Sequence, residues 1–461
     1  MIRKILIANR GEIACRIERT CKRLGIESVA VFSDADADAP HVRGADQSVH
    51  IGPAPVKDSY LRIDAIIDAA KRTGCDAIHP GYGLLSEKRV FAEAAAEAGL
   101  TFIGPPPEAL DAFGDKIKAR QVAREVDVSP PPGSDGPMEV GNAEMLRAEA
   151  ERIGFPLLVK AAGGGGGIGM QIVTRIEDLE RAARACSDRG KSAFHDDRIY
   201  LERYLEMPRH IEVQVMCDRH GNAVALGERE CSVQRRHQKI IEECQSPAEF
   251  FRGELGQQKR EALHADALRI VKHVEYVGAG TVEFVADARG HLWFLEVNAR
   301  LQVEHPVTEM VSGLDLVELQ IRIANGERIG DVTWRPQGHA IEARVYAEDP
   351  AKKFAPQPGK IAKLVWPEGL EGVRIDTGVE TGSEVTPYYD PMLAKVIGYG
   401  GDRRDAIRAL DRALAGTELE LVGPRGPAAT NVPFLRKVLA DERFVAGEYD
   451  TLLAEAIASG K

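Results

Sequence analysis

The stretch from Thr281 to Pro306, TVEFVADARGHLWFLEVNARLQVEHP, constrains the fold more than any other part of the chain. Two runs of alternating apolar and polar residues flank a short turn at positions 289 and 290, and this pattern predicts a β-hairpin. With a two-residue turn there, Glu283 lies directly opposite Glu296 on the neighbouring strand. Opposed residues on paired strands are about 4.5–5.5 Å apart at Cβ. We therefore expect the two carboxylates to lie side by side.

Two carboxylates at this separation predict a bound cation. Bare carboxylates repel each other, and the repulsion raises the pKa of one of them. A hard divalent cation such as Mg²⁺ removes that cost, because it takes oxygen ligands and completes its shell with phosphate oxygens and water. The hairpin thus predicts a metal site at Glu283 and Glu296.

Polar residues then occupy every second position after this pair. The series is Glu296, Asn298, Arg300, Gln302 and Glu304. In an extended chain these side chains project to one face. Acids, amides and a guanidinium on one face are poor core material, and a solvent-exposed edge strand would carry Lys and Thr instead. The series therefore favours a site for an anion and a metal.

The composition limits the class of protein. The chain has 461 residues, 28% of them charged, and a formal net charge of −11. An acidic protein has no general field for nucleic acid, so an anionic substrate must be met by local basic clusters. Seven scattered cysteines without a C-x-x-C pair are typical of reduced cytosolic thiols. No apolar run suits a signal peptide or a transmembrane helix. We expect a cytoplasmic protein of about three domains, without nucleic acid or membrane partners.

Strand and helix patterns alternate along residues 1–114. Strands are predicted at 4–8, 28–32, 77–79 and 101–103, and helices at 12–24, 59–73 and 88–98. This rhythm is typical of a parallel sheet covered by helices. The first turn, ANRGE, has a single glycine, which argues against a dinucleotide site. The loop HPGYGLLSE at 79–87 follows a strand at its carboxyl end, where such sheets bind ligands, although a plain turn fits that segment equally well.

A glycine-rich loop, AAGGGGGIG at 161–169, lies between predicted strands at 155–160 and 170–175. A Rossmann loop opens a helix and a Walker loop ends in Gly-Lys-Ser/Thr, so this loop is neither. Backbone N–H groups of successive glycines converge on an anion, and glycines leave the tip free to move as a lid. With Lys160 before its tip, the hairpin predicts a lid over a phosphate. The preceding SPPPGSDGPM at 129–138 is predicted to be a linker.

A dense basic run, ERECSVQRRHQK at 228–239, alternates with acids. In an acidic protein this favours a local anion pocket over a nucleic-acid surface. These features together form the ATP-grasp arrangement. In it, a glycine-tipped lid covers a nucleotide, lysines lie at the phosphates, and a two-carboxylate metal site lies beneath the nucleotide.

Eight motifs in order then show a resemblance that covers essentially the whole chain. They are IANRGEIACRI, HPGYGLLSE, GDK, KAAGGGGGIGM, ECSVQRRHQK, EVNARLQVEHPVTEM, GHAIEARVYAEDP and PYYDPMLAKVI. Together they resemble the biotin carboxylase family, the biotin-carboxylating components of acyl-CoA carboxylases and of pyruvate carboxylase. The resemblance implies an α/β fold, α+β overall, with an N-terminal parallel-sheet domain at 1–114. It also implies a central ATP-grasp domain at 115–335, with its glycine-rich lid at about 131–203. A C-terminal biotin carboxylase domain would follow at 336–461.

The resemblance also implies the roles of particular residues. It assigns ATP to Lys116, Lys160, Gly165, Gly166, Glu202, Leu205, His210, Gln234 and His237, with Glu202 and Leu205 at the adenine. It assigns Mg²⁺ or Mn²⁺, as two ions, to Glu283, Glu296 and Asn298, and bicarbonate to Arg300, Gln302 and the Val303 backbone. It makes Glu304 the general base with Arg300, Lys239 and Arg344 as catalytic partners, and it places Tyr82 and Arg344 at the biotin ring.

The activity implied is the ATP- and bicarbonate-dependent carboxylation of biotin through carboxyphosphate. Biotin would be a carrier-linked substrate. The sequence has no Met-Lys-Met acceptor motif, so the carrier is expected on a separate chain unless this sequence is a fragment. The expected partners are therefore a biotin carboxyl carrier and a carboxyltransferase subunit in trans, and a second copy of the chain in a homodimer.

Two departures from the family pattern keep alternatives open. Ile168 stands where relatives place Arg or Lys at the lid tip, which suggests a catalytically weak ATP-binding paralogue with a regulatory or partner-binding role. Arg23 stands where stand-alone bacterial relatives carry Glu at their dimer contact, which weakens the expectation of a homodimer. The other alternative function is that of another ATP-grasp ligase, such as a carbamoyl-phosphate or purine-pathway enzyme.

Overall fold

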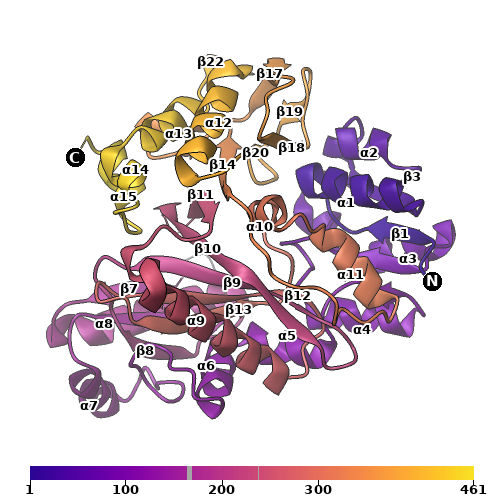
Figure 1. Ribbon diagram of the computed structural model, residues 1–461. Coiled ribbons are helices and arrows are strands. Elements are labelled where there is room, and N and C mark those ends of the chain that lie inside the picture. Colours follow the sequence, from indigo (N-terminus) through magenta and orange to yellow (C-terminus); the bar gives the residue numbers. More distant parts are fainter. Residues whose placement is uncertain (164–168, 237, 461) are drawn as a thin grey trace.

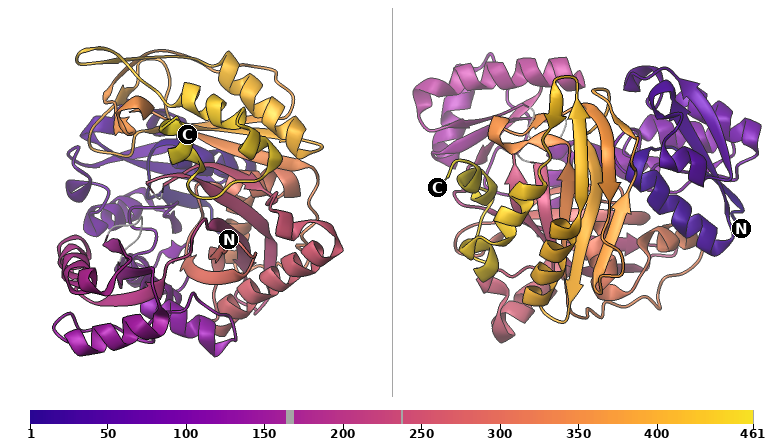
Figure 2. Two further views of the ribbon diagram at one scale, coloured as in Figure 1. Left: turned by 90° about the vertical axis from the view of Figure 1, so that its left-hand side faces the viewer. Right: turned by 90° about the horizontal axis from the view of Figure 1, so that it is seen from above.

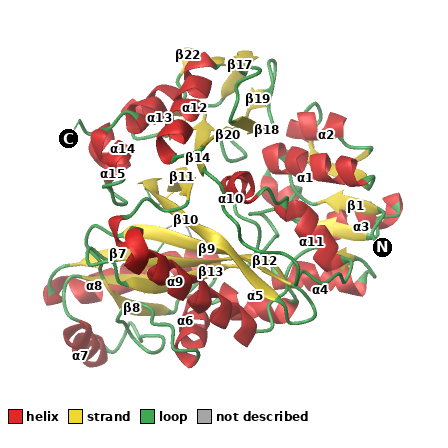
Figure 3. Ribbon diagram, viewed as in Figure 1, coloured by secondary structure: helices red, strands yellow, loops and turns green. Residues whose placement is uncertain are grey.

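The structure is a computed structural model that describes residues 1–163, 169–236 and 238–460. The N-terminal part lies at one side, the C-terminal part at the top and the central part and lid below, around helix α10 (His305–Ser312) (Figure 1). Helices surround the sheets on most sides, as the colouring by secondary structure shows (Figure 3). No helix in the described ranges is long and apolar enough to cross a membrane.

The N-terminal sheet is parallel, as predicted, with strand order β3-β2-β1-β4-β5. The strands are β1 (Lys4–Ile7), β2 (Glu27–Ser33), β3 (Gln47–Gly52), β4 (Ala77–His79) and β5 (Thr101–Phe102), and the helices are α1 (Gly11–Leu24), α2 (Pro40–Gly44), α3 (Ile63–Thr73) and α4 (Arg89–Glu97). The sequence analysis missed β3 and α2. β3 is an edge strand with half of its residues exposed, and only Val49 and Ile51 alternate with polar residues, which is too short a pattern to detect.

Two helices lead from this sheet into the lid. They are α5 (Pro107–Gly114) and α6 (Lys116–Glu125), and the Asp115 carboxylate caps α6 by accepting from the backbone N–H groups of Ile117 and Lys118 at 2.8 and 3.2 Å. This cap fixes Lys116 at the first turn of the helix.

The lid is a small antiparallel sheet with helices packed on it. It contains α7 (Ala143–Ile153), β6 (Leu157–Ala161), β7 (Met170–Val173), α8 (Leu179–Phe194) and β8 (Ile199–Arg203), in strand order β7-β6-β8. The stretch 129–138 is irregular, as predicted, but it is attached to the lid, because Gly133 and Met138 form bridges with Glu202 and Ile199.

One eight-stranded sheet, β13-β12-β9-β10-β11-β14-β20-β18, joins the central and C-terminal parts. Its central members are β9 (Arg209–Cys217), β10 (Ala223–Arg235), β11 (Gln238–Cys244), β12 (Gly278–Ala286) and β13 (Leu292–Asn298), flanked by α9 (Gly253–His273) and α11 (Leu316–Ala324). Its C-terminal members are β14 (His339–Tyr346), β18 (Val373–Thr377) and β20 (Met392–Gly400). The pairing of β11 with β14 brings residues from the central and C-terminal parts onto one face.

The remaining C-terminal elements lie around the C-terminal strands of this sheet, and α15 also contacts β10 (Figure 2). They are β15 (Glu348–Asp349), β16 (Ala355–Pro356), β17 (Gly359–Val365), β19 (Glu384–Val385), β21 (Glu418–Gly423), β22 (Gly426–Ala428), α12 (Arg403–Gly416), α13 (Val432–Leu439), α14 (Glu442–Ala446) and α15 (Leu453–Ala458). α12 packs on β20, and apolar side chains of both elements enter the C-terminal core.

Candidate active site

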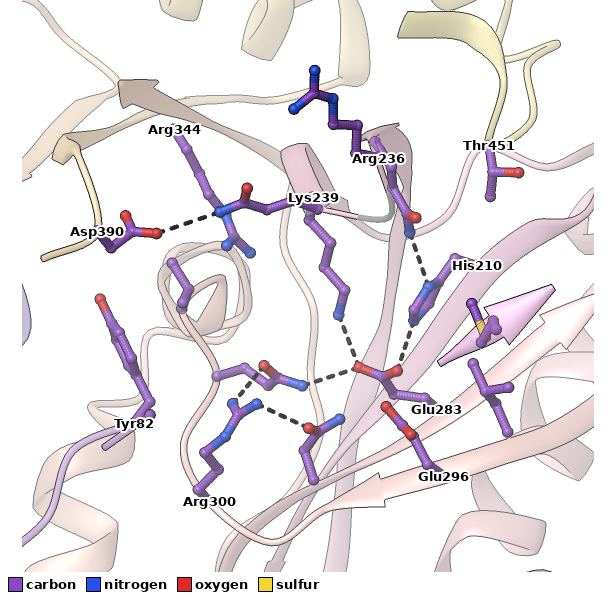
Figure 4. Close-up of a pocket in the computed structure, with 18 of the residues that line it drawn as sticks. Tyr82, His210, Arg236, Lys239, Glu283, Glu296, Arg300, Arg344, Asp390 and Thr451 are labelled. Atoms are coloured by element: carbon purple, nitrogen blue, oxygen red, sulfur yellow. Dashed lines mark hydrogen bonds and ion pairs between the residues drawn. The ribbon is translucent and has the colours of Figure 1, made fainter. Parts of the chain in front are cut away.

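A cleft of about 1200 Å³ lies where the N-terminal sheet, the lid and the large sheet meet. Tyr82 and Arg344 line one side of it, Glu283 and Glu296 line the other, and Lys239 lies between them (Figure 4). The cleft therefore collects side chains from every part of the fold.

The hairpin β12–β13 supplies the paired acids. Glu283 and Glu296 are direct partners across the two strands, as predicted. The predicted two-residue turn is wrong, because the loop runs from Asp287 to His291, closed by a hydrogen bond of 3.0 Å from the Asp287 N–H to the His291 carbonyl. A β-bulge next to Glu283 places one extra residue in β13 and restores the pairing.

Each acid of the pair has a cation of its own. Glu283 Oε1 accepts from Lys239 Nζ at 2.9 Å, and Glu283 Oε2 lies 3.1 Å from His210 Nε2. Glu296 Oε2 pairs with Lys116 Nζ at 2.8 Å. Burial alone would raise the pKa of Glu283, but Lys239 and His210 outweigh it and hold this pKa well below its usual range. The Glu283 carboxylate is therefore ionised and able to bind a cation.

Lys239 is the centre of the charge network. Its Nζ lies 2.5 Å from Glu212, 2.9 Å from Glu283 and 2.7 Å from Glu304. Burial would lower the pKa of this lysine, but the three carboxylates raise it well above its usual value. Lys239 therefore stays charged throughout the physiological range.

The polar series after Glu296 folds into one connected group. Arg300 donates from Nη2 to Asn298 Oδ1 at 2.9 Å and from Nη1 to Gln302 Oε1 at 2.8 Å, and Gln302 Nε2 donates to Glu283 at 3.1 Å. Only its start is extended, because β13 ends at Asn298 and a loop follows. Asn298, Arg300 and Gln302 nevertheless line the cleft, whereas Glu304 is buried behind it. This arrangement suits the binding of a small planar anion.

Glu304 ends this series at the N-terminus of α10. It is fully buried, and its second oxygen lies 3.0 Å from Arg344 Nη2. Burial alone would raise the pKa of Glu304, but Lys239 and Arg344 hold it below its usual range. Glu304 is thus an ionised carboxylate, the form that accepts a proton.

Tyr82 occupies the loop at the carboxyl end of β4. Gly81 and Gly83 on either side have φ of 63° and 64°, a conformation that favours glycine. Asn9 holds the loop by donating from Nδ2 to the Tyr82 carbonyl at 2.8 Å, and the Tyr82 hydroxyl donates to Glu12.

The backbone at Val303 is also held from behind. Its carbonyl accepts from Lys395 Nζ at 2.9 Å, and Lys395 pairs with Glu12 Oε2 at 3.1 Å. Glu12 thereby connects the Tyr82 loop to the segment that carries Val303.

The residues expected at ATP lie along the lid side of the same cleft. Lys160, Glu202, Leu205, His210 and Gln234 all line it, together with Lys116. The Glu202 carboxylate accepts from Lys160 Nζ at 3.0 Å and from Arg120 at 2.6 Å. The Glu202 side chain therefore fixes Lys160, and the role of this segment at adenine remains a prediction.

Four residues named from the sequence lie outside the described residues. These are Gly165, Gly166, Ile168 and His237. Their expected roles at the phosphates remain predictions, as does the alternative of a catalytically weak paralogue, which depends on Ile168.

The sequence analysis missed several supporting residues. Glu87 accepts from Arg300 Nε at 2.9 Å and from the Ala299 N–H at 3.0 Å, which fixes the anion-binding loop. Glu12 and Glu87 stand inside quoted motifs, IANRGEIACRI and HPGYGLLSE, so the motifs contained the signal. Lys395 also stands inside one, but Glu212 stands in none.

The donor set fits a hard divalent cation. Glu283, Glu296 and Asn298 offer oxygen atoms from one end of the hairpin, and both acids are direct strand partners. Oxygen donors are the ligands that Mg²⁺ and Mn²⁺ take in proteins.

Comparison of sequences places this site in a known family. Residues 1–110 match the profile "Biotin carboxylase, N-terminal domain", residues 115–332 match "Carbamoyl-phosphate synthase L chain, ATP binding domain", and residues 342–456 match "Biotin carboxylase C-terminal domain". The biotin carboxylase of Halalkalibacterium halodurans is 47% identical over 98% of this chain and 97% of its own length. The human mitochondrial propionyl-CoA carboxylase alpha chain is 46% identical over 97% of this chain, and this chain spans 60% of its length.

Solved structures agree with this. A biotin carboxylase from Campylobacter jejuni, in a "beta-gamma-ATP" complex, matches with a TM-score of 0.92 at 42% identity and covers 99% of both chains. The biotin carboxylase domain dimer of Hydrogenobacter thermophilus 2-oxoglutarate carboxylase, with MgADP, ADP and bicarbonate, matches with a TM-score of 0.92 at 40% identity over 99% of this chain and 97% of its own. Because biotin carboxylase profiles flank the ATP-binding domain on both sides, the alternative of a carbamoyl-phosphate or purine-pathway ligase is wrong. The chain belongs to the biotin carboxylase family and is an ATP-dependent ligase.

Proposed function

We propose that this chain carboxylates biotin, with ATP and bicarbonate as co-substrates and carboxyphosphate as the intermediate. The observation that carries the proposal is Glu304, an ionised and fully buried carboxylate between Lys239 and Arg344. It lies next to the loop of Arg300 and Gln302, which lines the same cleft as the paired acids of the hairpin.

In the first step, Glu304 takes the proton of bicarbonate held by Arg300, Gln302 and the Val303 N–H. A bicarbonate oxygen then attacks the γ-phosphorus of ATP, the bond to the β-phosphate oxygen breaks, and ADP leaves. Lys116 and Lys160 meet the charge that develops on the phosphates. Glu283, Glu296 and Asn298 would hold Mg²⁺ or Mn²⁺, which neutralises phosphate charge when bound.

In the second step, carboxyphosphate separates into CO₂ and phosphate. The phosphate takes the N1′ proton of biotin, and N1′ forms the new bond to CO₂. Arg344 stabilises the negative charge on the ureido oxygen of biotin, because its guanidinium is always protonated. Tyr82 lies on the same side of the cleft as Arg344 and would form another wall of the biotin pocket (Figure 4).

The partners follow from the chemistry and from the relatives. The longer relatives are subunits named for acyl-CoA carboxylases, so we infer a biotinylated carrier and a carboxyltransferase as partners. A homodimer is supported by the dimer of the Hydrogenobacter thermophilus domain. Arg23 pairs within the chain with Asp315 at 2.7 Å and Glu318 at 2.6 Å, so a dimer contact there would have to include this group of charges.

The proposed activity predicts that phosphate release from ATP requires bicarbonate and is enhanced by free biotin. Steady-state phosphate release, with each substrate omitted in turn, measures this. Turnover that biotin leaves unchanged, or that ammonia stimulates, would argue against the proposal.

The metal assignment predicts that Glu296→Gln lowers turnover by roughly 10²-fold at fixed Mg²⁺, since a metal ion supplies several kcal/mol of charge stabilisation. Its free energy of unfolding should change little, because Glu296 is only partly buried. Turnover against Mg²⁺ concentration measures the effect, with Glu384→Gln on the exposed edge strand β19 as control. An unchanged Mg²⁺ dependence in Glu296→Gln would remove this residue from the metal site.

A further inference from the structure

Two buried glutamates behind the cleft have no part in the mechanism above. Glu242 on β11 and Glu342 on β14 are direct partners in the antiparallel pair, and both are fully buried. Directly opposed side chains on such strands are about 4.5–5.5 Å apart at Cβ. The sheet thus brings two carboxyl groups together without solvent.

Arg344 connects this pair to the active site. It lies two residues beyond Glu342 on the same face of β14, and its Nη2 is 2.5 Å from Glu242 Oε1 and 3.0 Å from Glu304 Oε2. One guanidinium therefore serves both the proposed base and a carboxylate behind it.

The other cations nearby are committed to different partners. Lys395, opposite Arg344 on β20, directs its Nζ to the Val303 carbonyl and to Glu12. Lys239 directs its Nζ to Glu212, Glu283 and Glu304. Within the described residues, neither oxygen of Glu342 has a hydrogen-bond partner.

Two titratable groups near the pair, His305 and Cys231, are neutral and therefore do not change its net charge. His305 on α10 is fully buried, and burial with the nearby Lys395 holds its pKa well below its usual value. Cys231 on β10 is buried as well, and burial with the nearby carboxylates raises the pKa of its thiol well above its usual value. The balance of charge at Glu242 and Glu342 is therefore set by Arg344, Lys395, Lys239 and Glu304.

Two ionised carboxylates in this position would repel each other in a medium that screens poorly. Burial and the nearby Glu304 raise the pKa of Glu242 to about 7, although Arg344 and Lys239 oppose the shift. Burial and Glu242 raise the pKa of Glu342 well above its usual value, although Lys395 opposes the shift. A buried acid pair of this kind titrates as one unit.

We propose that Glu242 and Glu342 share one proton and act together as a positioning pair for Arg344. The pair then carries a single negative charge, which holds the guanidinium from behind. When Glu304 takes the proton of bicarbonate and loses its charge, Arg344 keeps one anionic partner and stays in place for the biotin ring. This role depends on the proposed function, whereas the shared proton does not.

Infrared spectroscopy of the substrate-free protein tests the proton directly. A protonated carboxyl group has a C=O stretch that is distinct from the carboxylate bands and shifts in D₂O. Burial raises the pKa of Glu18 to about 8, so Glu18 also carries a proton at neutral pH, and the pair is followed in the difference spectrum between wild type and variant. We expect Glu242→Gln alone and Glu342→Gln alone to remove the same C=O band, because the remaining glutamate then lacks the second carboxyl group and lies near Arg344 and Lys395. Glu243→Gln is the matched control, since Glu243 is a buried neighbour that pairs with Arg403 at 2.6 Å and should leave the band unchanged.

Difference spectra in which neither variant loses a C=O band would overturn the proposal. A C=O band lost in only one of the two single variants would overturn it too, because the proton would then belong to one glutamate alone. Both results are independent of turnover, so they are distinguishable from a failure of the proposed function.

Kinetics test the positioning role. Each single Gln variant keeps one negative charge, so turnover should fall less than about threefold. The double variant removes that charge. Its turnover should fall about tenfold or more, its KM for biotin should rise, and its ATP binding should stay unchanged. This loss is much larger than the two single effects combined, so the two substitutions are strongly non-additive. Additive effects of the two substitutions, or an unchanged KM for biotin in the double variant, would contradict a shared positioning role.

Discussion

Replacing Glu304 with glutamine should lower biotin-dependent phosphate release by roughly 10²–10⁴-fold, the usual contribution of a general base. The amide keeps the shape of the side chain but cannot take the proton of bicarbonate. ATP affinity should change little, because Glu304 lies behind the anion loop and contacts Lys239 and Arg344 rather than the lid. Steady-state turnover and ATP titrations by thermal shift measure the two effects separately.

Glu309→Gln provides the control for this substitution. Glu309 is a buried carboxylate on the same helix, paired with Arg16 at 2.6 Å and Arg374 at 2.7 Å outside the cleft. It should lose stability while keeping turnover of the folded protein. If Glu304→Gln lowered turnover less than about tenfold, the base would be another group.

Replacing Lys239 with methionine should have the largest combined effect on folding and activity. The substitution leaves Glu212, Glu283 and Glu304 buried around an apolar side chain, and breaking a buried ion pair in this way costs about 3–5 kcal/mol in the free energy of unfolding. Turnover should fall to background, because Glu283 and Glu304 can no longer both stay ionised. Chemical denaturation and phosphate release measure these two effects, with Lys239→Arg as the charge-conserving control.

The pH dependence of Lys239→Met has a definite sign. In the wild type, the lowered pKa values of Glu283 and Glu304 give stability that is present above the pKa of the unfolded chain and is lost in acid. In the variant these carboxyl groups lose Lys239 and keep only His210 and Arg344, so their pKa values rise and the folded state binds more protons. Its free energy of unfolding should therefore increase as the pH falls from about 8 to about 5. A variant with wild-type pH dependence would contradict the central role of Lys239.

The sequence predicted the paired acids for a partly incorrect reason. A two-residue turn gave the pairing of Glu283 with Glu296, whereas the real loop is longer and a β-bulge compensates for it. The pairing survives because both acids must face the cleft, and a strand slipped by one residue would turn one of them to the opposite face. Alternating polar and apolar residues thus predicted the face correctly but not the turn.

The groups that the sequence did not reveal are those that only tertiary structure assembles. Glu87 meets Arg300 across 213 positions of the chain. Glu242 meets Glu342 because β11 pairs with β14, and no periodicity within either segment predicts that neighbour. Local patterns predict elements and the residues they present, whereas pairing between distant strands decides which charges meet.

Transfer of labelled bicarbonate to biotin tests the central claim most directly. The purified chain, with ATP, Mg²⁺, biotin and labelled bicarbonate, should form carboxybiotin in amounts that match the phosphate released, and Glu304→Gln should form almost none. Phosphate release without labelled carboxybiotin, or equal labelling by Glu304→Gln and the wild type, would contradict the account.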